Sequence, residues 1–289
     1  MRRALAAAAV LGAAALSTCS PFTADGGGGG GGADASPEGA VGVGSDGGGS
    51  DILSRSDPGC PGPGRGPAMA RVGNVCIDRT EVSNAHYLAF LNDKAKSTAG
   101  LPAPCTNHTP TAGSTVPGAC PSKARADGRF PVSCVTFCDA TAFCRWSGRR
   151  LCGALGSGDR VSPAANIGYS VDEWTHACGA AKGDLYAGGG KPSNACALSL
   201  DELPDGFVPY GAHEVDLKRC EGPAGVFDLA GNVSEWVNAC NTDNTKCRVA
   251  GESYSWADPD DPGRCTYADD DPPLAVYTDL GFRCCATPN

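Results

Sequence analysis

The sequence lacks several features that commonly reveal a function. It has four histidines, and none of them is spaced as H-x-x-x-H, so a histidine-ligated zinc or iron site is poorly supported. Neither a G-x-S-x-G motif nor a phosphate-binding glycine motif occurs in the part expected to fold. The formal net charge of −9 comes without a basic stripe, which argues against nucleic acid as a partner. Outside the apolar run at residues 4–16, no segment reaches the length of about 18 apolar residues that a transmembrane helix needs.

Cysteine, in contrast, is abundant, with 17 residues in a chain of 289. The chain has no C-x-x-C spacing, which metal-binding cysteine tetrads commonly use. Setting Cys19 aside leaves an even number of cysteines. Because free thiols at this density do not persist in an oxidising compartment, we expect up to eight disulfides in an exported protein.

The first residues are typical of an export signal. Two arginines precede an apolar run at residues 4–16 that is too short to anchor the chain by itself. Residues 16–19, Leu-Ser-Thr-Cys, resemble a bacterial lipobox, although Thr18 stands where Gly or Ala is usual. We therefore expect residues 1–19 to be a lipoprotein-type signal peptide, with a lipid on Cys19 holding the protein at the cell envelope, on the bacterial outer membrane. Ordinary secretory cleavage beside an incidental cysteine is the alternative.

The composition divides the rest of the chain into two parts. Residues 20–58 are rich in Gly, Ser, Asp and Ala and bury too little apolar surface to fold, so we expect a disordered tether. Residues 60–289 have the length of one domain. Their many glycines and prolines, with short apolar runs, predict an irregular α+β fold.

Three helices are predicted from their end signals. Ser83 is a candidate N-cap for the first, and Thr136 for the second, which Gly148 would end. The third has a capping box at residues 170–173, Ser-Val-Asp-Glu, and ends at Cys178.

Five segments occur in a distinctive order, and Gly-Asn-Val-Ser-Glu-Trp and Gly-Phe-Arg are the most specific motifs in them. The segments are 77–87, 130–151, 173–174, 225–236 and 281–284. Together they resemble the formylglycine-generating enzyme (sulfatase-modifying factor) domain family. The resemblance covers about residues 71–286 and implies a disulfide-rich α+β domain related to the C-type lectin fold.

Enzymes of that family oxidise a cysteine of a sulfatase peptide to formylglycine, using copper held by two reduced thiols. The resemblance implies that Trp256 stands where the first thiol belongs, and Asp261 or a neighbour where the second belongs. By position, Cys265 matches a structural cysteine instead. Because Cu(I) needs soft thiolate ligands, we expect no copper and no catalytic residues, only the scaffold.

The disulfide pairing is predicted in two steps. The resemblance implies Cys144–Cys284 and Cys178–Cys265. Proximity in sequence adds Cys60–Cys76, Cys105–Cys120, Cys196–Cys220 and Cys240–Cys247, and it leaves Cys138–Cys152 and Cys134–Cys285 as a guess.

The resemblance further implies two structural calcium sites, since calcium prefers six to eight hard oxygen ligands. Their residues are Asp228, Gly231, Val233 and Glu235 for the first, and Asn194, Ala195, Asp205 and Phe207 for the second. The alternative is that these glycine-containing segments are merely turns.

Two function hypotheses follow. In the first, the chain is a non-catalytic envelope lipoprotein whose domain is a binding or structural module, with a groove at Ser253, Tyr254 and Trp256 for a glycan or a peptide. Acidic clusters at 258–261 and 269–271 would favour a sugar or a cationic peptide, although solvated loops have the same composition. In the second, the chain is a divergent copper-dependent oxidase that uses Cys265 with another thiol on a sulfatase-like peptide. A structural surface protein without a ligand is a third reading.

Overall fold

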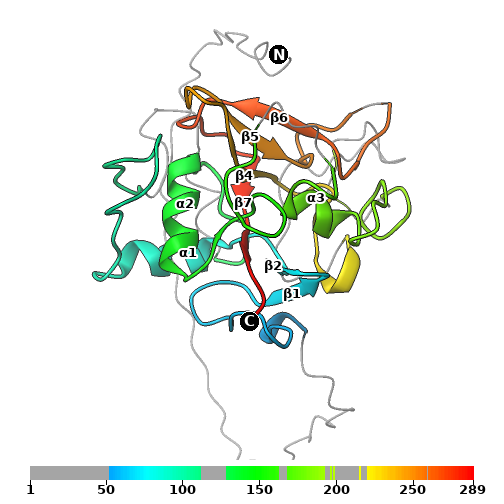
Figure 1. Cartoon of the computed structure of the whole chain (residues 1–289), viewed down its shortest axis with the longest axis horizontal. Coiled ribbons are helices and arrows are strands. Elements are labelled where there is room, and N and C mark those ends of the chain that lie inside the picture. Colours follow the sequence, from blue (N-terminus) through cyan, green and yellow to red (C-terminus); the bar gives the residue numbers. More distant parts are fainter. Residues whose placement is uncertain are drawn as a thin grey trace, which may run out of the picture. The chain divides into compact units, whose positions relative to one another are not determined.

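The computed structural model shown in Figure 1 describes most of the expected domain. Residues 1–51, which include Cys19, lie outside the described residues, and so do the four residues of the second calcium set. Among the residues that the structure describes, no helix has the length and apolar character needed to cross a membrane. The described residues are 52–111, 128–162, 168–192, 196, 198, 215, 220–258 and 260–289.

Two four-stranded sheets form the frame of the domain. The first has the order β1-β2-β8-β3, with every neighbouring pair antiparallel, and its strands are Met69–Val72, Val75–Asp78, Cys284–Ala286 and Arg150–Leu151. The second has the order β6-β5-β4-β7, and its strands are Ala268–Asp271, Cys247–Ala250, Ser234–Cys240 and Leu280–Phe282. In it β4 and β7 run parallel, whereas the other pairs are antiparallel.

The C-terminal segment passes from one sheet to the other within a single residue. Strand β7 ends at Phe282 and β8 begins at Cys284, so only Arg283 lies between them. Figure 1 shows this segment, in red, running from the upper sheet towards the C-terminus. The junction therefore couples the positions of the two sheets.

The first two helices begin where their sequences predict. Helix α1, Asn84–Asn92, is capped by Ser83. Helix α2, Phe137–Trp146, is capped by Thr136 in a capping box with Asp139, and Gly148 follows it with a φ of +76°. Both caps satisfy backbone N–H groups that a helix start leaves without partners.

The start of the third helix differs from its prediction. Helix α3, Glu173–Cys178, is capped by Asp172, whose carboxylate accepts the backbone N–H of Thr175 at 2.8 Å. Ser170 therefore lies before the cap rather than at it. The short helices η1, Ile52–Ser54, and η3, Pro223–Gly225, complete the described elements.

The apolar core has two main clusters. In one, rings from α1, α2 and β7 pack together, with Phe143 5.7 Å from Phe90 and 5.4 Å from Phe282 between ring centroids. The other surrounds Trp174 of α3 and includes apolar side chains of β1, β2 and β5. This buried frame of short elements confirms the expected α+β class.

Both disulfides implied by the family resemblance are present, Cys144–Cys284 and Cys178–Cys265. They join α2 to β8 and α3 to the segment after β5. Three of the pairs expected from proximity are confirmed as well, namely Cys60–Cys76, Cys196–Cys220 and Cys240–Cys247.

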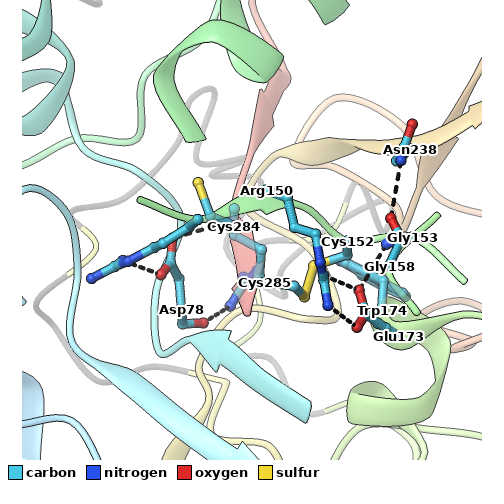
Figure 2. Close-up of a disulfide and its surroundings, with 12 residues drawn as sticks. Asp78, Arg150, Cys152, Gly153, Gly158, Glu173, Trp174, Asn238, Cys284 and Cys285 are labelled. Atoms are coloured by element: carbon cyan, nitrogen blue, oxygen red, sulfur yellow. Dashed lines mark hydrogen bonds and ion pairs between the residues drawn. A yellow bond between two sulfur atoms is a disulfide. The ribbon is translucent and has the colours of Figure 1, made fainter. Parts of the chain in front are cut away.

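The other expected pairings are wrong. Cys105 is bonded to Cys138 rather than to Cys120, because the 101–111 segment lies against the first turn of α2. Cys152 is bonded to Cys285, which excludes both Cys138–Cys152 and Cys134–Cys285. The sheet explains this pair, since β3 and β8 are antiparallel neighbours and bring these cysteines to a Cα–Cα distance of 4.8 Å (Figure 2).

The described chain begins against the edge of the first sheet. Although residues 52–58 were assigned to the tether, Asp57 donates its backbone N–H to the carbonyl of Met69 at 2.9 Å. Its carboxylate accepts the backbone N–H of Arg71 at 2.8 Å and pairs with Arg79. Contacts with the domain thus begin before Cys60.

Candidate functional site

The loop after β5 contains the two positions where the family resemblance places copper-binding thiols. Glu252 fixes its shape, because this buried carboxylate accepts the backbone N–H of Asp258 at 3.1 Å and that of Gly263 at 2.6 Å. Burial raises the pKa of Glu252 above its usual range. The two ends of the 252–263 loop are therefore held together by one side chain.

Trp256, at the position of the first thiol, is packed into this loop. Its ring lies 4.6 Å from that of Tyr267, with 33° between the ring planes. Its backbone N–H donates to the hydroxyl of Ser253 at 3.1 Å. The indole is half-buried, so it keeps a surface that a ligand could contact.

Asp261, which the resemblance places at or beside the second thiol position, is the centre of a polar network. Its carboxylate accepts the hydroxyl hydrogen of Tyr186, and it pairs with Lys191 at 3.0 Å and with Arg264. The hydrogen bonds from Tyr186 and Lys191 lower the pKa of Asp261, so the group is ionised at neutral pH. A carboxylate bonded in this way supplies neither sulfur nor a reducing electron.

The three residues expected in a ligand groove are not equally accessible. Ser253 is buried, and its hydroxyl donates to Asp279 at 2.6 Å. Tyr254 is half-buried and donates to the carbonyl of Thr278 at 3.3 Å. Only the two aromatic side chains, Tyr254 and Trp256, therefore offer surface.

The cysteines of the described residues are all committed to disulfides, 15 in number. Cys265, which the oxidase hypothesis requires as a thiol, is bonded to Cys178. That hypothesis therefore lacks its proposed copper ligand in this structure.

A buried charge centre lies where the two sheets join. Arg283 donates from Nε to both carboxylate oxygens of Glu235 at 2.8 Å, and its Nη2 lies 2.7 Å from Oε1. The same guanidinium donates to the carbonyl oxygens of Asp78 and Phe227, at 3.1 and 2.9 Å. Trp174 donates its indole N–H to Glu235 at 2.8 Å.

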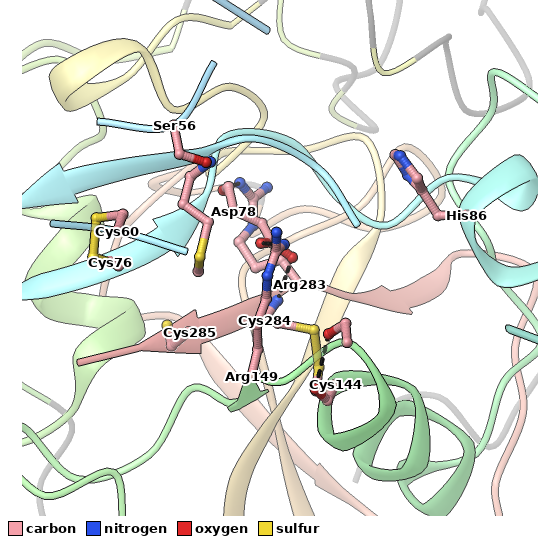
Figure 3. A network of polar contacts seen from close by, with 12 residues as sticks. Ser56, Cys60, Cys76, Asp78, His86, Cys144, Arg149, Arg283, Cys284 and Cys285 are labelled. Carbon is pink, nitrogen blue, oxygen red and sulfur yellow. Dashed lines mark hydrogen bonds and ion pairs between the residues drawn. A yellow bond between two sulfur atoms is a disulfide. The ribbon is translucent and has the colours of Figure 1, made fainter. Parts of the chain in front are cut away.

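A second buried ion pair lies beside the first. The carboxylate of Asp78 pairs with Arg149 and accepts the backbone N–H of Cys284 at 2.8 Å (Figure 3). The Arg283–Glu235 pair thus ties the β7–β8 junction to β4, and Asp78 of the second pair ties it to β2.

Two residues of the first calcium set, Asp228 and Glu235, belong to this centre. Asp228 adopts a φ of +60°, and both of its carboxylate oxygens are buried. Burial and the negative charge of Asp228 raise the pKa of nearby Glu81 to about 8. Within the described residues Glu81 Oε2 accepts no hydrogen bond, while Oε1 accepts one from Asn232 at 2.9 Å.

These features fit a cation. Three acidic side chains, Glu81, Asp228 and Glu235, lie close to a single guanidinium. Because a pKa of about 8 leaves Glu81 mostly protonated at neutral pH, the excess negative charge comes from Asp228 and Glu235 against one Arg283. The Glu235 oxygens already accept bonds from Arg283 and Trp174. In the described part of the chain, no three His, Cys, Asp or Glu side chains are grouped as a metal site, so backbone oxygens would have to complete one.

The fold is that of a sulfatase-modifying-factor domain. The family model described as "Sulfatase-modifying factor enzyme 1-like domain" matches residues 41–288, and the chain belongs to this family.

Two curated relatives are both named "Inactive C-alpha-formylglycine-generating enzyme 2". The Bos taurus protein is 31% identical over 172 residues, which are 54% of this chain and 50% of that protein. The Mus musculus protein is 28% identical over 171 residues, 55% of this chain and 49% of that protein. The chain thus spans about half the length of the curated relatives it matches.

Solved structures are similar at lower identity. A crystal structure of CarF is 22% identical, with a TM-score of 0.49, and covers 74% of this chain and 87% of that one. PvdO from Pseudomonas aeruginosa is 20% identical, with a TM-score of 0.47, and covers 74% and 80%.

Sequence reasoning missed the residues that lock the loop. Glu252 carries no signal in its local sequence that would mark it as the residue that holds both ends of the loop. Asp279, Tyr186 and Lys191 are distant in sequence from the loop that they contact. Nothing in their local sequence marks them.

The charge centre yields a stability prediction. Arg283→Met removes the cation and leaves Glu235 buried without it, so the free energy of unfolding should fall by about 3–5 kcal/mol. Urea denaturation at neutral pH measures this change. The matched control is Arg264→Met, whose side chain is 45% exposed, and it should cost at most about 1 kcal/mol. Equal losses in the two variants would show that the buried pair has no special role.

Proposed function

We propose that this chain is a non-catalytic envelope lipoprotein whose sulfatase-modifying-factor domain serves as a binding module. The observation that supports the proposal is that Cys265 is bonded to Cys178, while Trp256 and Asp261 stand where the family resemblance places the two thiols, Asp261 or a neighbour in the second case. Each of these two side chains is built into its own set of contacts, on Tyr267 in one case and with Tyr186, Lys191 and Arg264 in the other. The printed names of the two curated relatives, which call those proteins inactive, agree with this proposal.

The proposed ligand surface is the outer face of the 252–263 loop. Tyr254 and Trp256 offer half-exposed aromatic surface, and Asp258 and Asp260 lie beside them in the chain. Because Tyr267 stacks on one face of Trp256, a ligand would contact the remaining face and edge. Aromatic surface next to carboxylates suits a glycan, through C–H stacking and hydroxyl groups, or a cationic peptide.

The proposed placement at the membrane follows from the export signal. A lipid on Cys19 would anchor the chain, and residues 20–51 would serve as the spacer. Mass spectrometry of the purified envelope fraction would detect a diacylated or triacylated N-terminal cysteine. An unmodified N-terminus beyond residue 19 would exclude this anchor.

Enzymatic activity is tested directly. The purified chain, incubated with copper and a cysteine-containing sulfatase peptide, should produce no aldehyde, because Cu(I) lacks a thiolate pair. An active formylglycine-generating enzyme assayed in parallel is the positive control. Aldehyde above the level of the copper-only blank would overturn the non-catalytic assignment.

Ligand binding is tested with Trp256→Ala. Binding to glycan and cationic-peptide arrays should fall about tenfold or more in this variant, since a stacked aromatic contact is lost. Tyr169→Ala, which removes an aromatic residue that is 45% exposed elsewhere, is the matched control and should bind like the unmodified chain. Binding that survives Trp256→Ala would place the ligand away from this loop.

We further propose that calcium binds as a structural ion at Asp228, Gly231, Val233 and Glu235, through side-chain and backbone oxygens of this set. It would offset the excess negative charge of the buried centre. The Tm should then fall when EDTA is added, and Asp228→Asn should remove most of this dependence on EDTA. A Tm that EDTA leaves unchanged would count against the ion. The second set, residues 194, 195, 205 and 207, remains a prediction from the family resemblance.

A further inference from the structure

A pocket of about 230 Å³ lies away from the 252–263 loop and shares no residue with it. Its buried floor includes Ala68 and Thr80, and its rim includes the more exposed Leu53, Pro63 and His86. Most of these groups are apolar. The pocket therefore has the composition of a small-molecule site, with an apolar wall and a few polar groups.

The wall that contains Leu53 is held in place by a buried arginine. Arg79 donates to the carbonyl oxygens of Ala224 and Gly225 at 2.7 and 3.2 Å, and it pairs with Asp57 at 2.5 Å. These bonds tie the 52–57 segment to η3. The pocket is thus formed before any ligand arrives, which lowers the entropy cost of binding.

His86, in the first turn of α1, supplies a hydrogen-bond donor. Ser83 Oγ accepts the backbone N–H of His86, so its own hydrogen is available for Nδ1 of the imidazole, 3.0 Å away. Burial and the charge of Arg149 lower the pKa of His86 to about 4, so the ring is neutral at pH 7. A neutral ring that accepts at Nδ1 carries its hydrogen on Nε2.

Two guanidinium groups lie near the pocket, and each is already paired with a carboxylate, Arg79 with Asp57 and Arg149 with Asp78. Among the described lining residues Arg79 is charged and none is acidic. Arg149 stands behind the wall at Gly66, where an added Cβ would lie 2.8 Å from its guanidinium. The Arg149 side chain is only 1% exposed, and within the described residues its Nε has no hydrogen-bond partner.

We propose that this pocket binds a small, mainly apolar carboxylate, of about the size of benzoate, which accepts a hydrogen bond from Nε2 of His86. The size follows from volume, since an apolar cavity of about 150 Å³ holds benzene and the present pocket is larger by enough for a carboxylate. The chemical class follows from the apolar walls, the imidazole donor and the Nε–H of Arg149 behind Gly66, which has no hydrogen-bond partner within the described residues.

The test is a titration of the whole ¹⁵N-labelled chain with sodium benzoate at pH 7 and constant ionic strength. Saturable shifts are expected for residues around the pocket, and benzyl alcohol should bind more weakly because it lacks the carboxylate. His86→Leu should weaken benzoate binding about tenfold or more. Leu88→Ala, on the exposed side of the same helix, is the matched control and should leave the affinity unchanged.

A readout on the unmodified chain keeps the test decisive if His86→Leu does not fold. The His86 Nε2 hydrogen should shift downfield and exchange more slowly with water when benzoate binds. No saturable shifts up to the solubility limit of benzoate, or shifts that leave this hydrogen unaffected, would overturn the proposal. Because the pocket and the 252–263 loop share no residue, neither outcome bears on the proposed glycan or peptide surface.

Discussion

The buried pair of Arg283 and Glu235 is the constraint on which the arrangement of the two sheets depends. Arg283 is the single residue between β7 and β8, while Glu235 lies in β4, the parallel neighbour of β7. The guanidinium also donates to the carbonyl oxygen of Asp78, at the end of β2. One side chain thus bonds to both sheets, and its removal from water is compensated by charge and by several hydrogen bonds together.

This frame is independent of the loop where family enzymes hold copper. The disulfide Cys178–Cys265 and the carboxylate of Glu252 fix the loop by its ends, whichever residues stand between them. Within the loop, Trp256 packs on Tyr267, and Asp261 bonds to Tyr186, Lys191 and Arg264. Residues of such a loop can change while the fold stays the same, because function depends on the site and not on the fold.

Parts of this structure could be predicted from the sequence because their causes are local. The caps at Ser83 and Thr136 depend on residues within one helical turn, and two disulfides followed from a match to known positions. Proximity failed for Cys105 and Cys152, whose partners are set by sheet order and helix docking. The N-cap of α3 lies two residues later than predicted, because the side chain of Asp172, and not that of Ser170, accepts the backbone N–H of Thr175. The pocket at His86 could not be predicted, since its walls come from segments that only the fold brings together.

The disulfide between Cys60 and Cys76 has a mechanical consequence. It links the segment that precedes the sheet to β2, a central strand of its sheet, and the backbone N–H of Asn289 bonds to Gly59 beside it. Tension applied through the N-terminal side of the chain would reach the interior of the domain along covalent bonds. The edge strand β1 lies within the loop of chain that this disulfide closes, so it would bear little of that load.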